Sequence, residues 1–140
     1  MNNLLTMKQA CKATGMSYEA LKFYCNEGLV PNVKRDHNNR RVFDEKDVKW
    51  IKDLTCLKKC GMSIQEMKKY LELCLQGEAT IVSRKKMLAR KQEELRASIK
   101  ELEDSISYIG WKQNFYDDFL SGKRPYVSNL IRTAEKTKNN

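Results

Sequence analysis

The stretch that decides the fold is Thr6–Tyr24, TMKQACKATGMSYEALKFY. It opens on a T-x-x-Q capping box, in which two side chains satisfy each other's backbone N–H groups at a helix start. A first helix is therefore predicted over residues 7–13. Ser17 is a suitable N-cap for a second helix over residues 18–26. Two short helices joined by a glycine-containing turn are typical of a helix-turn-helix, although many small helical proteins contain such a corner without binding nucleic acid.

Residues 28–43 predict a short β-hairpin after the second helix. The ends of this segment are apolar and β-branched, and its middle, Asp36-His37-Asn38-Asn39, has the composition of a turn. Four cations fall near the predicted tip: Lys34, Arg35, Arg40 and Arg41. Because like charges so close together repel one another, the hairpin indicates an anionic partner.

Capping signals divide the rest of the chain into three helices. Asp44 precedes a helical apolar pattern over residues 45–60, and Ser63 opens a capping box before a fourth helix. From about residue 80 to residue 120 there is no proline and one glycine, so a single long helix of about 60 Å is predicted. We therefore expect one domain over residues 1–77, a long helical segment over 78–121, and a tail at 122–140.

The long helix carries a heptad seam, a stripe made of two rows of residues that repeat every seven positions. One row is apolar throughout, and the other is polar in the first half of the helix. Its apolar members are Ile81, Leu88, Leu95, Ile99, Leu102, Ile106 and Ile109. The preceding segments are too short to cover such a seam, so it predicts a coiled-coil homodimer. An aromatic cluster near the end of this helix, including Trp111 and Tyr116, is either packing or the lining of a small pocket.

Charge and composition indicate the kind of partner that the chain binds. The chain has a formal net charge of +9, and residues 1–60 carry 12 basic and 7 acidic side chains, which favours a polyanionic partner. No apolar run approaches the roughly 20 residues of a membrane span, and the N-terminus does not resemble a secretory signal. We therefore expect a soluble cytoplasmic protein with no membrane partner.

Catalytic and metal motifs are absent from the sequence. There is one histidine, and the chain contains neither a phosphate-binding loop nor a nucleophile elbow. The five cysteines include no C-x-x-C pair. We expect no enzyme activity, no catalytic residues, no cofactor and no metal site.

Together these segments resemble the MerR family of bacterial transcription regulators. The matching residues are Thr6–Tyr24, Gly28-Leu29-Val30-Pro31, Arg41-Val42-Phe43, residues 57–64 and Met67. The resemblance covers about residues 4–120 and implies a mainly α fold: a winged helix-turn-helix with a small β-hairpin wing, followed by a long antiparallel coiled-coil dimerisation helix. The sequence departs from the family at Lys22, where most members carry Arg, and in a wing that lacks the usual Pro-x-Arg.

The resemblance also implies a function. Such a homodimer binds a near-palindromic operator in double-stranded promoter DNA, distorts that DNA in response to a signal, and so acts indirectly on RNA polymerase. The DNA-contacting residues that it implies are Ser17, Tyr18, Glu19 and Lys22 on the second helix; Tyr24, as a phosphate or packing contact; Lys34, Arg35, Arg40, Arg41 and Phe43 on the hairpin; and Lys58, Lys59 and Ser63 at a second phosphate clamp.

The signal to which the regulator responds has several candidates. One subgroup of the family answers electrophile stress through a cysteine in the third helix, and Cys56 falls at that position, with Lys52 and Lys59 near enough in sequence to favour its thiolate. Cys56 is alternatively a buried apolar residue. No cysteine beyond Cys74 is available for a metal-sensing loop. Two further hypotheses are a small organic ligand at the aromatic cluster and a coiled-coil adaptor whose helix-turn-helix binds protein.

Overall fold

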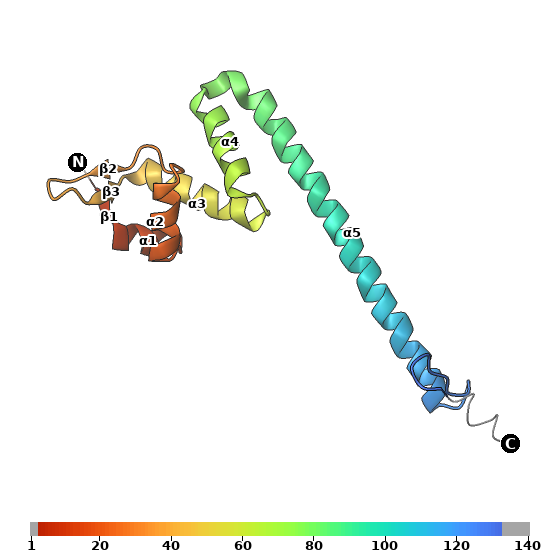
Figure 1. The fold of residues 1–140 in the computed structure, drawn as a ribbon. Helices are drawn as coiled ribbons and strands as arrows, with labels where there is room; N and C mark the ends of the chain where they lie inside the picture. The colour runs from red at the N-terminus through yellow and green to blue at the C-terminus, as the bar shows by residue number, and fades with distance from the viewer. Residues whose placement is uncertain (1–2, 133–140) are drawn as a thin grey trace. The chain divides into compact units, whose positions relative to one another are not determined.

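The computed structural model describes residues 3–132, which form helices and a small sheet (Figure 1). The elements are β1 (Leu5–Thr6), α1 (Met7–Thr14), α2 (Tyr18–Asn26), β2 (Lys34–Arg35), β3 (Arg41–Phe43), α3 (Glu45–Lys59), α4 (Ile64–Leu75), the 3-10 helix η1 (Gly77–Thr80) and α5 (Ile81–Leu120). The chain divides into two compact units after Leu95, within α5. The mainly α fold with a hairpin wing and a long last helix agrees with the prediction.

Side-chain caps begin the first four helices, as the sequence predicts. The Thr6 hydroxyl accepts from the backbone N–H of Gln9, and the Gln9 side chain accepts from the backbone N–H of Thr6. Asp44 and Ser63 form the same reciprocal capping box at α3 and α4, and the Ser17 hydroxyl accepts from the backbone N–H of Ala20 at α2. Because each cap satisfies one of the free N–H groups of its first turn, the caps fix where the helices start.

The sheet has one strand more than the predicted hairpin. Its strands are antiparallel in the order β1-β3-β2, with Leu5 opposite Phe43 and Lys34 opposite Val42. The additional strand, β1, has two residues and leads directly into α1. The sheet therefore ties the wing to the start of the helix-turn-helix.

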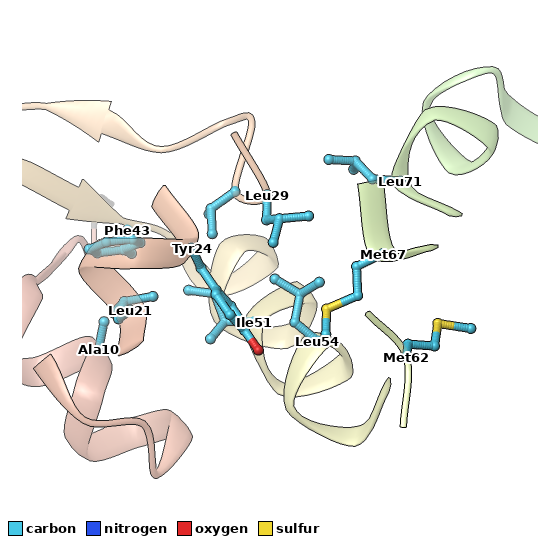
Figure 2. Close-up of a cluster of buried hydrophobic side chains, with 11 residues drawn as sticks. Ala10, Leu21, Tyr24, Leu29, Phe43, Ile51, Leu54, Met62, Met67 and Leu71 are labelled. Atoms are coloured by element: carbon cyan, nitrogen blue, oxygen red, sulfur yellow. The ribbon is translucent and has the colours of Figure 1, made fainter. Parts of the chain in front are cut away.

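One apolar core holds the first unit together (Figure 2). Its largest fully buried side chains are Phe43, Leu21, Leu29, Ile51, Leu54 and Met67. They come from α2 and the segment after it, β3, α3 and α4, and α1 adds the smaller Ala10. Burial of their apolar surface fixes these elements against one another. The first unit also includes the beginning of α5, beyond the boundary expected at residue 77, because Arg84 and Lys91 bond back to it.

The long helix α5 has no buried residue. Leu88 and Leu95 are each 39% exposed, and Ile106 reaches 70%. The heptad seam is thus uncovered in the single chain, as expected for a surface that another helix buries. Of the tail expected at residues 122–140, the last eight residues lie outside the described part. No helix among the described residues has the length and apolar character needed to cross a membrane.

Candidate nucleic-acid interface

The second helix of the helix-turn-helix, α2, presents a polar and aromatic outer face. Leu21 and Tyr24 point into the core, whereas Tyr18 is 53% exposed. Ser17, Glu19 and Lys22, also predicted for this face, are exposed. Phe23, which was not predicted from the sequence, is 46% exposed on the same helix. This face, starting at the capped N-terminus of α2, has the size and chemistry of a helix that enters a major groove.

A basic cleft lies between the start of α2 and the wing. It has a volume of about 510 Å³ and is lined by Tyr18, Lys8, Arg35, Arg40 and Arg41, among others. Three of the four predicted wing cations are therefore brought together with the recognition helix. Lys8, on α1, was not predicted because nothing in its local sequence separates it from an ordinary exposed lysine. The cleft gathers several cationic side chains that can contact DNA phosphate groups.

The wing arginines are held to different degrees. Nη1 of Arg35 donates to the carbonyl of Asn39 at 2.9 Å, and Nη2 of Arg41 donates to Oδ1 of Asn26 at 2.6 Å. The Arg40 side chain is exposed, and no side-chain partner holds it within the described residues. Arg41 is therefore oriented toward α2, while Arg40 is the wing cation most available to an incoming anion.

The wing turn is closed by Asp36. Its Oδ1 accepts from the backbone N–H groups of Arg40 and Asn38, each at 2.9 Å. These bonds hold the pKa of Asp36 below its usual range, with the Arg40 N–H the larger cause. Asn39, at φ 60°, supplies the left-handed residue that the turn requires. A turn fixed in this way positions the adjacent arginines before DNA binds.

The sequence predicts Lys34 as a free cation near the tip of the wing, but the structure shows its side chain paired. Its Nζ contacts Oδ2 of Asp44 at 2.9 Å and Oδ2 of Asp47 at 3.1 Å. From the first position of β2, the Lys34 side chain reaches the N-cap and the first turn of α3. The Lys34 ammonium, together with the backbone N–H of Asp47, lowers the pKa of Asp44 to about 2. The role of Lys34 is therefore to join the wing to α3, and its charge is already neutralised.

This ion pair predicts a pH-dependent loss of stability. Because the pKa of Asp44 is lower in the folded chain than its ordinary value of 3.8, the pair stabilises the fold above about pH 4. That stabilisation is lost as the pH falls toward 2. Lys34→Met should lower the Tm by a few degrees at pH 7 and flatten the decrease of Tm between pH 4 and 2. Thermal unfolding measured by circular dichroism tests this.

The matched control is Lys49→Met, because Lys49 forms an exposed pair with Glu45 at 3.8 Å. Exposed pairs of this kind contribute little, so its Tm should stay close to that of the wild type. Equal effects of the two substitutions at every pH would contradict the role given to Lys34.

A second groove lies on the other side of α2. Its volume is about 480 Å³, and its walls come from α2 and the corner between α3 and α4. Lys58, Ser63 and Phe23 are among its lining residues. The first turn of α4 offers backbone N–H groups beside Lys58, a combination that suits a phosphate. Lys59 is exposed but does not line this groove.

Burial corrects one predicted contact, Phe43, and decides between the two alternatives for another, Tyr24. Phe43 is fully buried beneath the wing, so the prediction that it grips the DNA backbone is wrong. Tyr24 is 3% exposed, and its buried hydroxyl has no hydrogen-bond partner among the described residues. Its place is in the core, which agrees with the packing alternative. Both are large aromatic residues two positions from a cation, and a linear sequence does not show which way such a side chain turns.

Cys56 is exposed on α3, so the alternative that it is a buried apolar residue is wrong. The other four cysteines are half-buried. Burial raises the pKa of the Cys25 thiol and of the Cys11 thiol, which keeps both protonated and less nucleophilic. Cys56 is the most exposed of the five cysteines.

The aromatic cluster at the end of α5 forms a cavity with the chain that follows it. The cavity has a volume of about 310 Å³ and is lined by Trp111, Phe115, Tyr116 and Tyr126, with polar atoms from the following residues. Nζ of Lys112 lies 5.3 Å from the centre of the Phe115 ring. No group of histidine, cysteine and acidic side chains that could hold a metal ion occurs in residues 3–132.

Comparisons with known proteins agree with this geometry. The family model described as MerR HTH family regulatory protein matches residues 5–74, and that described as MerR, DNA binding matches residues 48–109. An uncharacterised HTH-type transcriptional regulator of Haemophilus influenzae is 35% identical over 111 residues, which are 79% of this chain and 82% of that protein. The HTH-type transcriptional regulator AdhR of Bacillus subtilis is 34% identical over 91 residues, 65% of each chain.

Solved structures are similar over most of the chain. HiNmlR, a MerR family regulator lacking the sensor domain and bound to promoter DNA, has a TM-score of 0.68 at 33% identity over 84% of this chain and 94% of its own. A MerR family transcriptional regulator from Listeria monocytogenes has a TM-score of 0.70 at 27% identity, covering 96% of this chain and 95% of its own. With the family models, the relatives and the helix-turn-helix and wing in agreement, the chain belongs to the MerR family of helix-turn-helix transcriptional regulators.

Proposed function

We propose that this regulator binds a near-palindromic operator in promoter DNA as a homodimer through α2 and its two flanking grooves. The observation that carries the proposal is the arrangement around α2: an exposed recognition face with a basic cleft on the wing side and a groove with Lys58 on the other. A helix in the major groove with cations on both sides can contact the phosphates that border that groove. The DNA-bound structure of the similar regulator HiNmlR supports this.

In this proposal the dimer also changes the shape of the DNA that it binds. Two copies of α2, joined by the seam of α5, would read two half-sites, and a change in the angle between them would bend or underwind the promoter. RNA polymerase would then respond to the shape of the promoter, with no direct contact required.

The salt dependence of duplex binding tests the wing. Arg40→Ala and Arg41→Ala should each weaken binding to operator and unrelated duplex alike, because both arginines contact phosphate in this proposal. A dimer carries two copies, so each variant should reduce the slope of log K against log salt by about 2. Fluorescence anisotropy of a labelled duplex at several salt concentrations measures that slope.

Lys12→Ala is the control, since Lys12 is exposed at the end of α1 and lines neither groove. Its slope should equal that of the wild type. An unchanged slope in both wing variants would show that the wing does not touch the DNA backbone.

For the signal, we propose modification of Cys56 by an electrophile, supported by the exposure of this thiol on α3. The adduct would add bulk to the outer face of α3, within the DNA-binding unit. A second candidate is a small organic ligand in the aromatic cavity at Trp111 and Tyr116, supported by its volume of about 310 Å³. Cys56→Ser separates the two candidates, because only the first requires the thiol.

A further inference from the structure

The first unit contains a groove between α4 and the start of α5, away from the recognition helix and the wing. Its volume is about 510 Å³, within the usual range of about 300–1,000 Å³ for small-molecule sites. Met62, Leu73 and Met87 contribute an apolar lining. A site of this size and surface suits the apolar body of a small organic molecule.

Unpaired cations surround this apolar lining. Lys69 of α4 and Lys86 and Arg90 of α5 line the groove, and in residues 3–132 no hydrogen bond or ion pair occupies their charged ends. Lys91, in contrast, is 13% exposed and contacts Glu66 at 3.3 Å and Glu94 at 2.8 Å. The groove's two acidic side chains are therefore already paired, and its remaining charge is positive.

The groove's cations on α5 lie away from the seam. Successive residues of an α-helix are about 100° apart, so Lys86 and Arg90 lie about 160° around α5 from Leu88. These two cations thus lie on the side of α5 away from the seam. A second copy seated on Leu88 and Leu95 does not cover them through its seam contacts.

Hydrogen bonds hold α5 to the chain that precedes it at both ends of the groove. At one end, Nη2 of Arg84 donates to the carbonyl of Gly77 at 2.5 Å and Nε donates to the Thr80 hydroxyl at 3.0 Å. At the other end, Nζ of Lys91 donates to the carbonyl of Gly61 at 3.4 Å as well as to Glu66. A molecule held between these ties touches both the helix that carries the seam and the helix that begins at the second DNA groove.

We propose that this groove binds a small amphipathic anion, with its carboxylate or sulfonate at Lys69, Lys86 and Arg90 and its apolar body against the methionines. Binding between α4 and α5 would change the angle at which α5 leaves the DNA-binding unit. The coupling to DNA that follows rests on the proposed function, whereas the binding site does not.

The probe is 8-anilinonaphthalene-1-sulfonate, an aromatic sulfonate whose fluorescence rises in apolar surroundings. Titrated into the full-length protein without DNA, it should bind saturably. The double substitution Lys86→Glu and Arg90→Glu should weaken that binding at least about tenfold, because it replaces two attractive charges by repulsive ones. Decanoate should displace the probe, and decanol at the same concentration should not.

Two controls keep the result specific. Lys12→Glu reverses a charge outside the groove and should leave probe affinity unchanged, and Trp111→Ala tests the other cavity and should do the same. Circular dichroism and sedimentation show that each variant is folded and has the wild-type mass. Unchanged probe affinity in the folded double variant, or loss of binding in Trp111→Ala, would overturn the proposal. Equal displacement of the probe by decanol would show that the ligand need not be an anion and would overturn that part of the proposal.

Binding of the probe is read separately from binding of DNA. Saturable probe binding that depends on Lys86 and Arg90 supports the site even if the protein fails to bind any duplex, a result that would contradict the proposed function alone. With operator DNA present, the probe should change operator affinity in the wild type and not in the double variant. No change in the wild type would overturn the coupling.

Discussion

Replacing Leu95 and Leu102 by lysine is expected to separate the regulator into monomers and to reduce operator affinity by about 10²–10⁴-fold, the gain that linking two binding modules provides. Both leucines belong to the heptad seam, and they are 39% and 63% exposed in the single chain. In a dimer their apolar surface would be buried, and lysine there places unpaired charges against the partner helix. Sedimentation and light scattering measure the mass, and anisotropy measures the affinity.

The matched control is Lys100→Ala, which removes an exposed side chain of the same helix that pairs with Asp104. It should leave both the mass and the operator affinity close to the wild type. A wild-type protein that is monomeric at micromolar concentration would contradict the assignment of the seam to dimerisation.

Cys56→Ser is expected to abolish the response to aldehydes or quinones while operator binding stays normal. The thiol is exposed, so a reagent reaches it without unfolding of α3. If a helix of the second copy packs on this face of α3 in the dimer, an adduct overpacks that contact at a cost of about 1–3 kcal/mol. That is enough to shift a two-state equilibrium about tenfold or more. Transcription from the regulated promoter, with and without the aldehyde, measures the response.

The four half-buried cysteines supply the controls. Single serine substitutions at Cys11, Cys25, Cys60 and Cys74 should each keep the response. If Cys56→Ser still responds fully, the thiol hypothesis is wrong, and the aromatic cavity at Trp111 and Tyr116 becomes the better candidate. Trp111→Ala would then be the variant that loses the response.

Helix starts were predictable because their signal is local. A capping residue and its partner lie three positions apart, so Thr6 and Ser63 mark the beginnings of α1 and α4 without knowledge of the rest of the fold. Strand β1 and the 3-10 helix η1 were missed for the opposite reason. Leu5–Thr6 becomes a strand through pairing with β3, and η1 depends on the bonds that Thr80 and Arg84 make across the turn.

The candidate site was predictable in outline and less so in detail. Charge clustering predicted the basic cleft, since Arg35, Arg40 and Arg41 are close in sequence. Whether a cation is free depends on contacts that are distant in sequence. Lys34 is neutralised by residues 10 and 13 positions away, and Phe43 is covered by the packed core. These outcomes are set by tertiary packing, which periodicity does not determine.

The measurement that tests the central claim most directly is the stoichiometry and footprint of the full-length protein on promoter DNA. Labelled DNA from upstream of neighbouring genes, chosen for an inverted repeat within a long promoter spacer, is titrated at several salt concentrations and then probed by footprinting. We expect two chains per duplex, symmetric protection of the two half-sites and an affinity that falls steeply with salt. One chain per duplex, or no preference for the inverted repeat over a scrambled duplex, would contradict it and favour a protein-binding adaptor.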